Sequence, residues 1–337
     1  MPTLYLTIQT RTVHLDNQAL VITTEDESEK RHTTRILLHD ISRVVVSGSP
    51  NITVPALKSL CRAKIPLALI SSRGRWIGEL SGIVSNNAER RIAQYRCHIS
   101  GEAALLRFAL PLIATKISNQ RHVLRRLSNR HGRHCIFSLE RLSNLRKMLL
   151  TARELNHVRG LEGFAAAEYF KALSQFFPPE IPFVERSRRP PKNAANALLS
   201  FAYSILGAEV EFSVRLHGLD PAIGFLHSLE PGRASLALDL LEPLRPSVDA
   251  FVLSLLNRKI FTEKDFYFSP EDSGTYLTDN SHRKFFEHYE KAMSRRFAFE
   301  PTGTQMNMRT ILEWQIYRYL QSLADDQCPP AFFRIPQ

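Results

Sequence analysis

The sequence of 337 residues contains only four cysteines, Cys61, Cys97, Cys135 and Cys328, and no two of them form a CxxC pair. This spacing gives no signature of a zinc ribbon or a disulfide framework, and small reduced thiols are the expectation. The chain has no uninterrupted apolar run of the roughly 18 residues that suggest a membrane span. The opening segment MPTLYLTIQTRTVHLDN has no apolar leader core or cleavage motif. We therefore expect a soluble cytoplasmic protein that does not act at membranes.

Charge is present in ordinary amount but is unevenly divided between the two signs. Charged residues make up 23% of the chain, which argues against wholesale disorder, while the formal net charge is +11. A surplus of this size favours a polyanionic partner, and nucleic acid is the first candidate.

The apolar pattern changes its period near residue 86. Earlier residues are rich in β formers, with a predicted hairpin formed by Thr12–Leu15 and Ala19–Thr23 around the turn signal Asp16-Asn17. Further strands are predicted at Leu4–Ile8, Arg35–Leu38, Ile41–Val46, Pro66–Ile70 and Arg75–Leu80, and a short helix at Pro55–Arg62. Later residues follow the helical period of 3.6. We predict an α+β protein with a β-rich domain over residues 1–84 and a larger all-helical domain over residues 85–337.

Proline-rich joints separate several of the predicted helices. The helical segments are expected at roughly 102–127, 137–156, 159–176, 193–215, 234–255, 281–297 and 304–323. Proline lacks the amide hydrogen that a helix interior needs. Breaks between segments are therefore expected at Phe177-Pro178-Pro179, Arg189-Pro190-Pro191 and Leu244–Pro246.

Residues 116–147 carry nine Lys or Arg residues and a single acid, Glu140. A charge run is usually a solvated helix face, but so strong a bias favours binding to a nucleic-acid backbone. A second basic cluster precedes the helix expected at 193–215. The candidate DNA contacts are Arg121, Arg125, Arg126, Arg130, Arg133, Arg186, Arg188, Arg189, Lys192 and Arg233. Such residues position a duplex without specifying its bases.

A few acidic residues and one histidine lie in apolar surroundings and could hold a metal ion. Glu162 follows Gly160-Leu161, His227 ends an apolar turn-like segment, and Asp239 and Glu242 share one helix face. Glu168 is the alternative to Glu162 as the metal ligand from this segment. Carboxylates with one neutral imidazole suit Mg²⁺ or Mn²⁺. From spacing alone, a lone histidine after an apolar run is more often a core residue, and an Asp-x-x-Glu pair on a helix is more often solvated.

Four blocks in register resemble one family, the CRISPR-associated integrase Cas-one. The blocks are Arg159–Gly163 (RGLEG), Asn196–Tyr203 (NALLSFAY), Gly218–His227 (GLDPAIGFLH) and Gly232–Arg245 (GRASLALDLLEPLR). Asp279–Glu290 (DNSHRKFFEHYE) and Asp40–Val46 are similar to further stretches of that family. The resemblance implies a small β-sandwich followed by a helical catalytic domain, in agreement with the change of period. It also implies that Glu162, His227 and Glu242 are the catalytic metal ligands, with Asp239 as a possible alternative.

The resemblance implies the joining of short DNA fragments to a CRISPR array, by attack of 3′-hydroxyls on phosphodiesters. It further implies a homodimer, formed through the β-rich domain, that works on double-stranded DNA with a small partner, Cas-two. Two other functions share parts of the sequence evidence. One is a structure-specific, metal-dependent nuclease that cleaves branched DNA without integration, and the other is a non-enzymatic DNA-binding scaffold.

Overall fold

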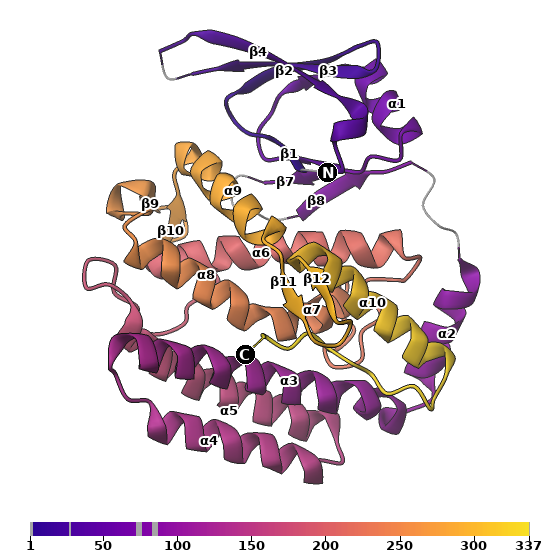
Figure 1. Cartoon of the computed structure of the whole chain (residues 1–337), viewed down its shortest axis with the longest axis vertical. Coiled ribbons are helices and arrows are strands. Elements are labelled where there is room, and N and C mark those ends of the chain that lie inside the picture. The colour runs from indigo at the N-terminus through magenta and orange to yellow at the C-terminus, as the bar shows by residue number, and fades with distance from the viewer. Residues whose placement is uncertain (1–2, 27, 72–75, 83–86, 337) are drawn as a thin grey trace.

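The computed structural model describes residues 3–26, 28–71, 76–82 and 87–336. A group of strands forms one end of the molecule, and the helices form the rest (Figure 1). The helices are α1 (Val54–Arg62), α2 (Ala88–Ile99), α3 (Glu102–His131), α4 (Ile136–Met148), α5 (Leu155–Leu173), α6 (Ala194–Leu216), α7 (Ser235–Leu241), α8 (Arg245–Asn257), α9 (Asp279–Ser294) and α10 (Met308–Ala324). The α+β class expected from the sequence is confirmed.

The N-terminal strands form two four-stranded sheets. The first has the order β1 (Thr3–Leu6), β5 (Arg43–Val46), β7 (Leu67–Ile70) and β8 (Trp76–Leu80). The second has the order β4 (Arg31–Leu37), β3 (Ala19–Glu25), β2 (Thr10–Asp16) and β6 (Asn51–Ile52). Leu6, Leu20 and Leu60 belong to one buried cluster, so both sheets and α1 share a core. Burial of this apolar surface is the main force that holds the sheets together.

The first sheet is buried on two sides. Val44 and Val46 of β5 belong to the N-terminal core, whereas Val45, between them, belongs to the core of the helical part. Because neighbouring side chains on a strand point to opposite faces, β5 contributes to both cores at once. This arrangement accounts for the unbroken apolar run of β5.

The predicted hairpin around Asp16-Asn17 is confirmed as β2 and β3, which pair from Asp16 opposite Ala19. Asn17 has a φ of 53°, in the left-handed region that asparagine tolerates better than most residues. The predicted strand Arg75–Leu80 is observed from Trp76 onward, and its first residue lies outside the described residues. The predicted domain boundary between residues 84 and 85 also lies outside them.

Helix α6 runs through the middle of the helical part and packs against α7, α8 and α10. By length and composition it could cross a membrane, but 78% of its most apolar window is buried inside the protein. Helices α2 and α3 pass the same test only as a pair, and they are bent by 102°. Core packing therefore accounts for the apolar character of α6. Helices α3, α4 and α5 form a layer beneath it (Figure 1).

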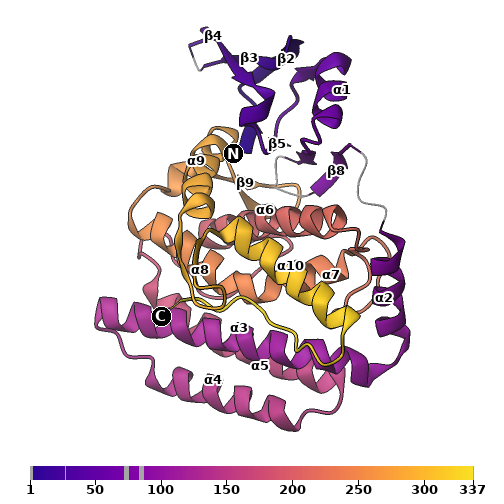
Figure 2. The ribbon, with the colours of Figure 1, turned by 45° about the vertical axis from the view of Figure 1, so that its right-hand side comes forward.

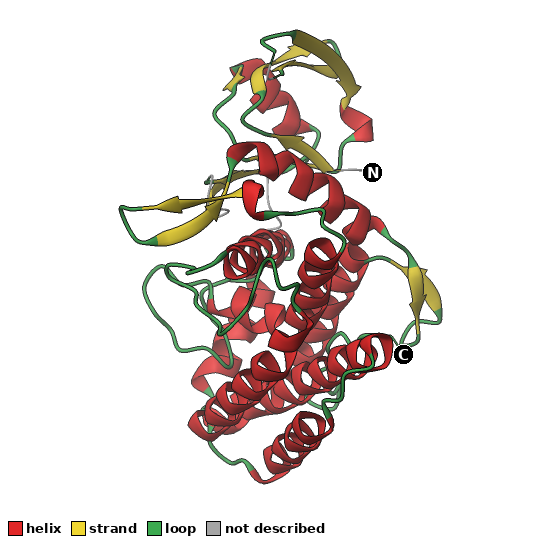
Figure 3. Ribbon diagram, turned by 90° about the vertical axis from the view of Figure 1, so that its left-hand side faces the viewer, coloured by secondary structure: helices red, strands yellow, loops and turns green. Residues whose placement is uncertain are grey.

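The prediction of an all-helical second part is wrong in one respect. Two short hairpins interrupt it, β9 (Phe266–Ser269) with β10 (Gly274–Leu277) and β11 (Phe297–Phe299) with β12 (Thr304–Met306). They project from opposite sides of the helical part (Figure 3). The helix expected at 234–255 is also broken by the 3-10 turn η4 (Glu242–Leu244) between α7 and α8, because Pro243 lies in that turn and Pro246 in the first turn of α8.

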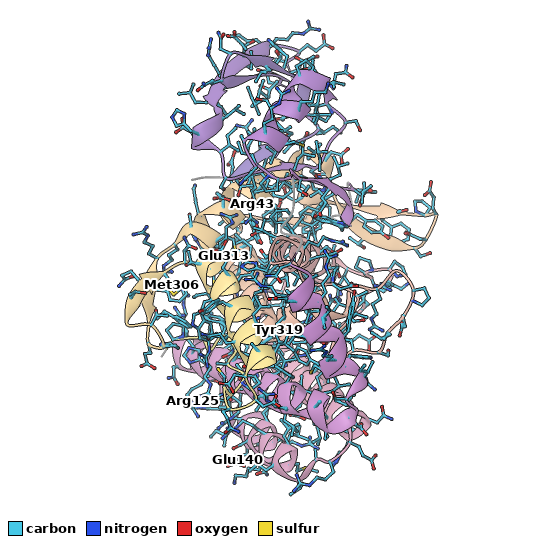
Figure 4. All side chains as sticks on the ribbon, turned by 90° about the vertical axis from the view of Figure 1, so that its right-hand side faces the viewer. Arg43, Arg125, Glu140, Met306, Glu313 and Tyr319 are labelled. Atoms are coloured by element: carbon cyan, nitrogen blue, oxygen red, sulfur yellow. The ribbon has the colours of Figure 1, made fainter. Side chains whose placement is uncertain are left out.

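A buried group of charges joins the two parts of the chain. Arg43 of β5 and Arg309 of α10 both bind Glu209 of α6, at 3.0 and 3.2 Å. Arg309 also binds Glu290 of α9, whose carboxylate accepts a hydrogen bond from the hydroxyl of Tyr5. Figure 4 shows Arg43 where the strands meet the helices. Burial alone would raise the pKa of Glu209, but the two guanidinium groups outweigh it and lower that pKa.

Candidate metal centre and basic surface

Three elements bring two glutamates and a lysine together in the interior. Lys116 lies in the middle of α3, Glu162 in α5 and Glu242 at the start of η4. The ammonium group of Lys116 donates hydrogen bonds to both carboxylates. The side chains of Lys116 and Glu242 are each 6% exposed, whereas that of Glu162 is 26% exposed. The predicted residues Glu162 and Glu242, 80 positions apart in the sequence, thus meet around one cation.

The electrostatics of this group favour the charged forms of Glu242 and Lys116. Burial would raise the pKa of Glu242, but Arg245, Lys116 and His227 outweigh it and hold that pKa well below its ordinary value. Arg245 donates from Nε to Oε1 of Glu242 at 2.8 Å. Burial would likewise lower the pKa of Lys116, but Glu242 and Glu162 raise it above its ordinary value. The site is therefore a set of mutually dependent ions in a buried setting.

His227 is held from behind by Asp239 of α7. Nδ1 of His227 lies 2.6 Å from Oδ1 of Asp239, which is fully buried. The backbone N–H groups of Phe225, Leu226 and His227 also donate to this carboxylate, at 2.6, 2.9 and 3.0 Å. An ionised carboxylate can only accept, so Nδ1 carries the proton and the lone pair of Nε2 is left for another ligand. The acceptor sites of Asp239 are occupied by the segment that carries His227.

The segment before His227 is fixed by neighbours on three elements. A Cβ at Gly224 would lie only 2.6 Å from Oδ2 of Asp239, so glycine is required there for the close approach. Arg159 of α5 donates to the carbonyl of Leu226 at 2.7 Å. Gln94 of α2 donates to the carbonyls of Asp220 and Ile223, both at 2.8 Å. Helix α2 lies against α10 at this end of the molecule (Figure 2).

The donor groups suit a hard divalent cation. Two carboxylates and the free Nε2 of an imidazole are ligands that Mg²⁺ and Mn²⁺ accept. The Lys116 ammonium already occupies a cation position between Glu162 and Glu242. In the described part of the chain, no group of three His, Cys, Asp or Glu side chains is close enough to hold an ion as it stands. An ion bound there requires the ammonium to leave its place between the glutamates.

The structure also shows where the alternative ligand Glu168 lies, and it adds residues to the site that the sequence did not predict. Glu168 does not join the site, because its carboxylate binds Ser138 and Arg141 of α4. Sequence reasoning missed Lys116 as part of the site and counted it in the basic run. Its neighbours Ile113 and Ile117 are fully buried, and a lysine on such an apolar helix face was the available signal. Arg245 and Gly224 were identified only as members of the blocks Gly232–Arg245 and Gly218–His227, without a role of their own.

The arginines of α3 differ in their surroundings. Arg125, Arg126, Arg130 and Arg133 are exposed. Arg121 is partly buried and donates to the carbonyl of Leu139 at 3.2 Å, so it also fastens α4 to α3. Along an ideal helix Arg130 lies within about 40° of the direction of Lys116, Arg126 within about 80°, and Arg125 on the opposite side. The exposed arginines therefore do not form a single line on α3.

The loop that carries the second basic cluster begins beside the end of α3. The rings of His131 in α3 and Phe176, just before the loop 177–193, are 5.8 Å apart. Both segments lie at the left of the helical part in Figure 1. In the loop Arg188, Arg189 and Lys192 are exposed. The backbone N–H of Thr275 donates to the carbonyl of Pro191 at 2.8 Å, so this basic cluster lies against β10.

Arg186 and Arg233 stand apart from these exposed groups. Arg186 donates to Asn196 and Ser200 and lies over the ring of Tyr203. Burial lowers the pKa of Arg186 to about 10. The guanidinium of Arg245 lies 4.8 Å from the centre of the same ring, so Arg186 anchors the loop directly behind the glutamate site. Arg233 is half-buried and pairs with Glu230.

Comparison with known proteins places the whole chain in one family. The family model described as CRISPR associated protein Cas1 matches residues 4–291. A CRISPR-associated endonuclease Cas1 of Thermodesulfovibrio yellowstonii is 35% identical over 82% of this chain and 87% of its own length. Another, from Rhodospirillum rubrum, is 34% identical over 98% of both chains. A Cas4/Cas1 exonuclease–endonuclease fusion of R. rubrum is 35% identical, and this chain spans 51% of its length.

Solved structures agree with this assignment at the level of the fold. A Cas1 protein from Thermotoga maritima has a TM-score of 0.79 at 25% identity, covering 99% of this chain and all of its own. A casposase bound to its integration product has a TM-score of 0.84 at 24% identity, covering 100% of this chain and 96% of its own, and shares the fold. The chain belongs to the Cas1 family, as the sequence blocks predicted.

Proposed function

We propose that this protein is a metal-dependent DNA integrase and endonuclease of CRISPR adaptation. It would insert short DNA fragments into the CRISPR array by attack of 3′-hydroxyls on phosphodiesters. The observation that carries the proposal is the meeting of Glu162 and Glu242 around one buried cation, with His227 close enough to Glu242 to affect its pKa. The Cas1 endonucleases named among the relatives support the same reaction class.

Each residue of the site has a distinct role in this proposal. Glu162 and Glu242 supply carboxylate ligands, and Nε2 of His227 supplies the third. Asp239 orients His227 by accepting from Nδ1 at 2.6 Å and is not itself a ligand, because the same carboxylate also receives three backbone N–H groups. A bound Mg²⁺ or Mn²⁺ would activate the 3′-hydroxyl and stabilise the charge at phosphorus.

The basic surface would hold the DNA backbone. Arg188, Arg189 and Lys192 stand on a loop that Arg186 and Tyr203 anchor behind Arg245. The end of α3 contacts the start of this loop. Phosphates held by the loop would lie on the side of the site that Arg186 and Arg245 border, and these cations would offset the repulsion between DNA and the glutamates. We assign these groups to backbone contact and not to base recognition.

The test is a strand-joining assay with a duplex that has free 3′-hydroxyls, an array target, the partner protein and Mn²⁺ or Mg²⁺. The variants E162A, H227A and E242A are expected to lose joining by about a thousandfold or more, because each removes one ligand group. E168A is the matched control, since that carboxylate lies on the same helix but binds α4. Circular dichroism checks that each variant is folded. Full joining by the folded ligand variants would reject the site.

A nuclease that never integrates is a second candidate, because the relatives are named endonucleases. The two activities differ in their product. Integration joins the donor fragment covalently to the target strand, whereas the nuclease leaves only shortened strands. A labelled donor resolved on a denaturing gel distinguishes them, and a chelator should abolish either activity. DNA binding that persists with a chelator and with E162A, without joining or cleavage, would favour the scaffold function instead.

The assembly is proposed on the same grounds. A Cas6-RT-Cas1–Cas2 complex contains a chain whose fold matches this one with a TM-score of 0.80 at 23% identity. We propose that this protein forms a homodimer through its β-rich domain and works with Cas2 in the cytoplasm. Light scattering measures the mass of the protein alone and with Cas2, and so tests both the homodimer and the binding of Cas2.

A further inference from the structure

Lys116 stands where the proposed metal site would have its positive centre. Its ammonium binds both Glu162 and Glu242, and the residue is 5% exposed. Glu242 also binds Arg245 through its other oxygen. The two carboxylates therefore already have two cations in direct contact, and their formal charges cancel.

A divalent ion would upset this balance. With Lys116 and Arg245 in place, the added ion leaves two surplus positive charges in a buried region, where unlike and like charges interact more strongly than in water. A phosphodiester brought to the same place supplies one compensating negative charge. The flexible stem and the three donors of a lysine allow its ammonium to move from carboxylate to phosphate oxygen.

We propose that Lys116 is an internal counter-ion that competes with the metal for Glu162 and Glu242 and makes metal binding depend on DNA. Without DNA the ammonium holds the two glutamates together and weakens metal binding. When a DNA phosphate arrives, Lys116 transfers to it, and the ion takes the position between the carboxylates. Lys116 is thus a positioning residue that couples the two ligands. This inference rests on the proposed metal site.

The coupling is reciprocal, because two ligands that favour the same state must assist each other equally. Mn²⁺ should tighten DNA binding by the same factor by which DNA tightens Mn²⁺ binding. In the wild-type protein we expect DNA to lower the Kd of Mn²⁺ by about tenfold or more, as one relieved charge contact of this kind is worth at least that much.

The experiment is calorimetric titration of Mn²⁺ into the full-length protein, with and without a saturating DNA duplex. In K116M, a substitution of similar volume, the metal should bind about tenfold or more tightly without DNA, and the duplex should add little. K116R keeps the charge and should retain most of the coupling. K58M is the matched control, because Lys58 is an exposed lysine of α1, outside the site.

The outcomes separate this inference from the function on which it rests. Wild-type protein that binds Mn²⁺ equally well with and without DNA, or K116M that matches it, would overturn the role of Lys116 and leave the metal site standing. Wild-type protein that binds no Mn²⁺ under either condition would overturn the metal site and the inference together. If K116M does not fold, K116Q, which also removes the positive charge, takes its place in the same titrations, with the same expected result.

Discussion

Nδ1 of His227 lies 2.6 Å from the fully buried carboxylate of Asp239. Replacing that carboxylate by an amide removes the charge that orients the imidazole. We expect D239N to weaken Mn²⁺ binding by about 10- to 100-fold, as the loss of such supporting contacts usually does. Calorimetric titration measures the affinity directly. E230Q is the control, since Glu230 is exposed and belongs to the same loop. Equal affinities in D239N and wild type would show that Asp239 does not support the site.

The salt dependence of DNA binding should identify which arginines of α3 contact phosphates. Arg126 and Arg130 are closer than Arg125 to the side of the helix that carries Lys116. We expect R126A and R130A each to reduce the slope of log K against log salt by about 0.9, the value for one released phosphate contact. R125A is the matched control and should leave the slope nearly unchanged. The measurement is fluorescence anisotropy over a range of salt concentrations, and an equal effect of R125A would contradict the assignment.

Asp249 should make the stability of the protein depend on pH. Burial raises its pKa to about 6 from an ordinary value of 3.8, although the hydroxyl of Tyr203 donates to it. The folded protein therefore holds this proton more tightly than the unfolded chain does. The stabilisation is complete below the unfolded pKa and is lost as pH rises through about 6.

The variant D249N removes this titration. Relative to D249N, the wild-type free energy of unfolding should fall by up to about 3 kcal/mol between about pH 4 and about pH 7. Urea denaturation followed by circular dichroism at several pH values gives the two curves. Parallel curves would show that Asp249 does not titrate in this range.

Removing Arg309 should destabilise the joint between the strands and the helices. R309M leaves the buried carboxylate of Glu209 and the half-buried carboxylate of Glu290 without a shared partner. Breaking a buried ion group in this way costs about 3 to 5 kcal/mol. Its matched control is R283M, because Arg283 pairs with Glu287 on the exposed side of α9. That variant should change the free energy of unfolding by less than about 1 kcal/mol. A small loss in R309M, measured by urea denaturation, would contradict the proposed role of the buried charges.

Local signals were sufficient to predict much of the fold. The hairpin of β2 and β3 was predictable because Asp16 and Asn17 form the turn that fixes its register. The two later hairpins were missed because strands of three or four residues are too short to show a clear period among longer helical patterns. The sequence marked a proline joint at Leu244–Pro246, but it did not show that α7 ends after only seven residues.

The site was harder to predict, because its contacts join distant positions. Lys116 is separated by 46 residues from Glu162 and by 126 from Glu242, so no pattern along the chain links them. The different surroundings of Asp239 and Glu242 also could not be predicted from the sequence. They depend on the backbone N–H groups of the segment before His227, which only the folded loop directs at Asp239. Resemblance to a family indicated the residues, whereas the structure shows their surroundings.

The contacts of Tyr5 limit the order in which the protein can fold during synthesis. Its hydroxyl binds Glu290 and Arg309, residues that follow it by 285 and 304 positions. During synthesis, these partners leave the ribosome 285 and 304 residues after Tyr5. Domains usually fold as they emerge, beginning with the N-terminal one. The first strand can join its own sheet early, but its attachment to α9 and α10 must wait until those two helices have emerged.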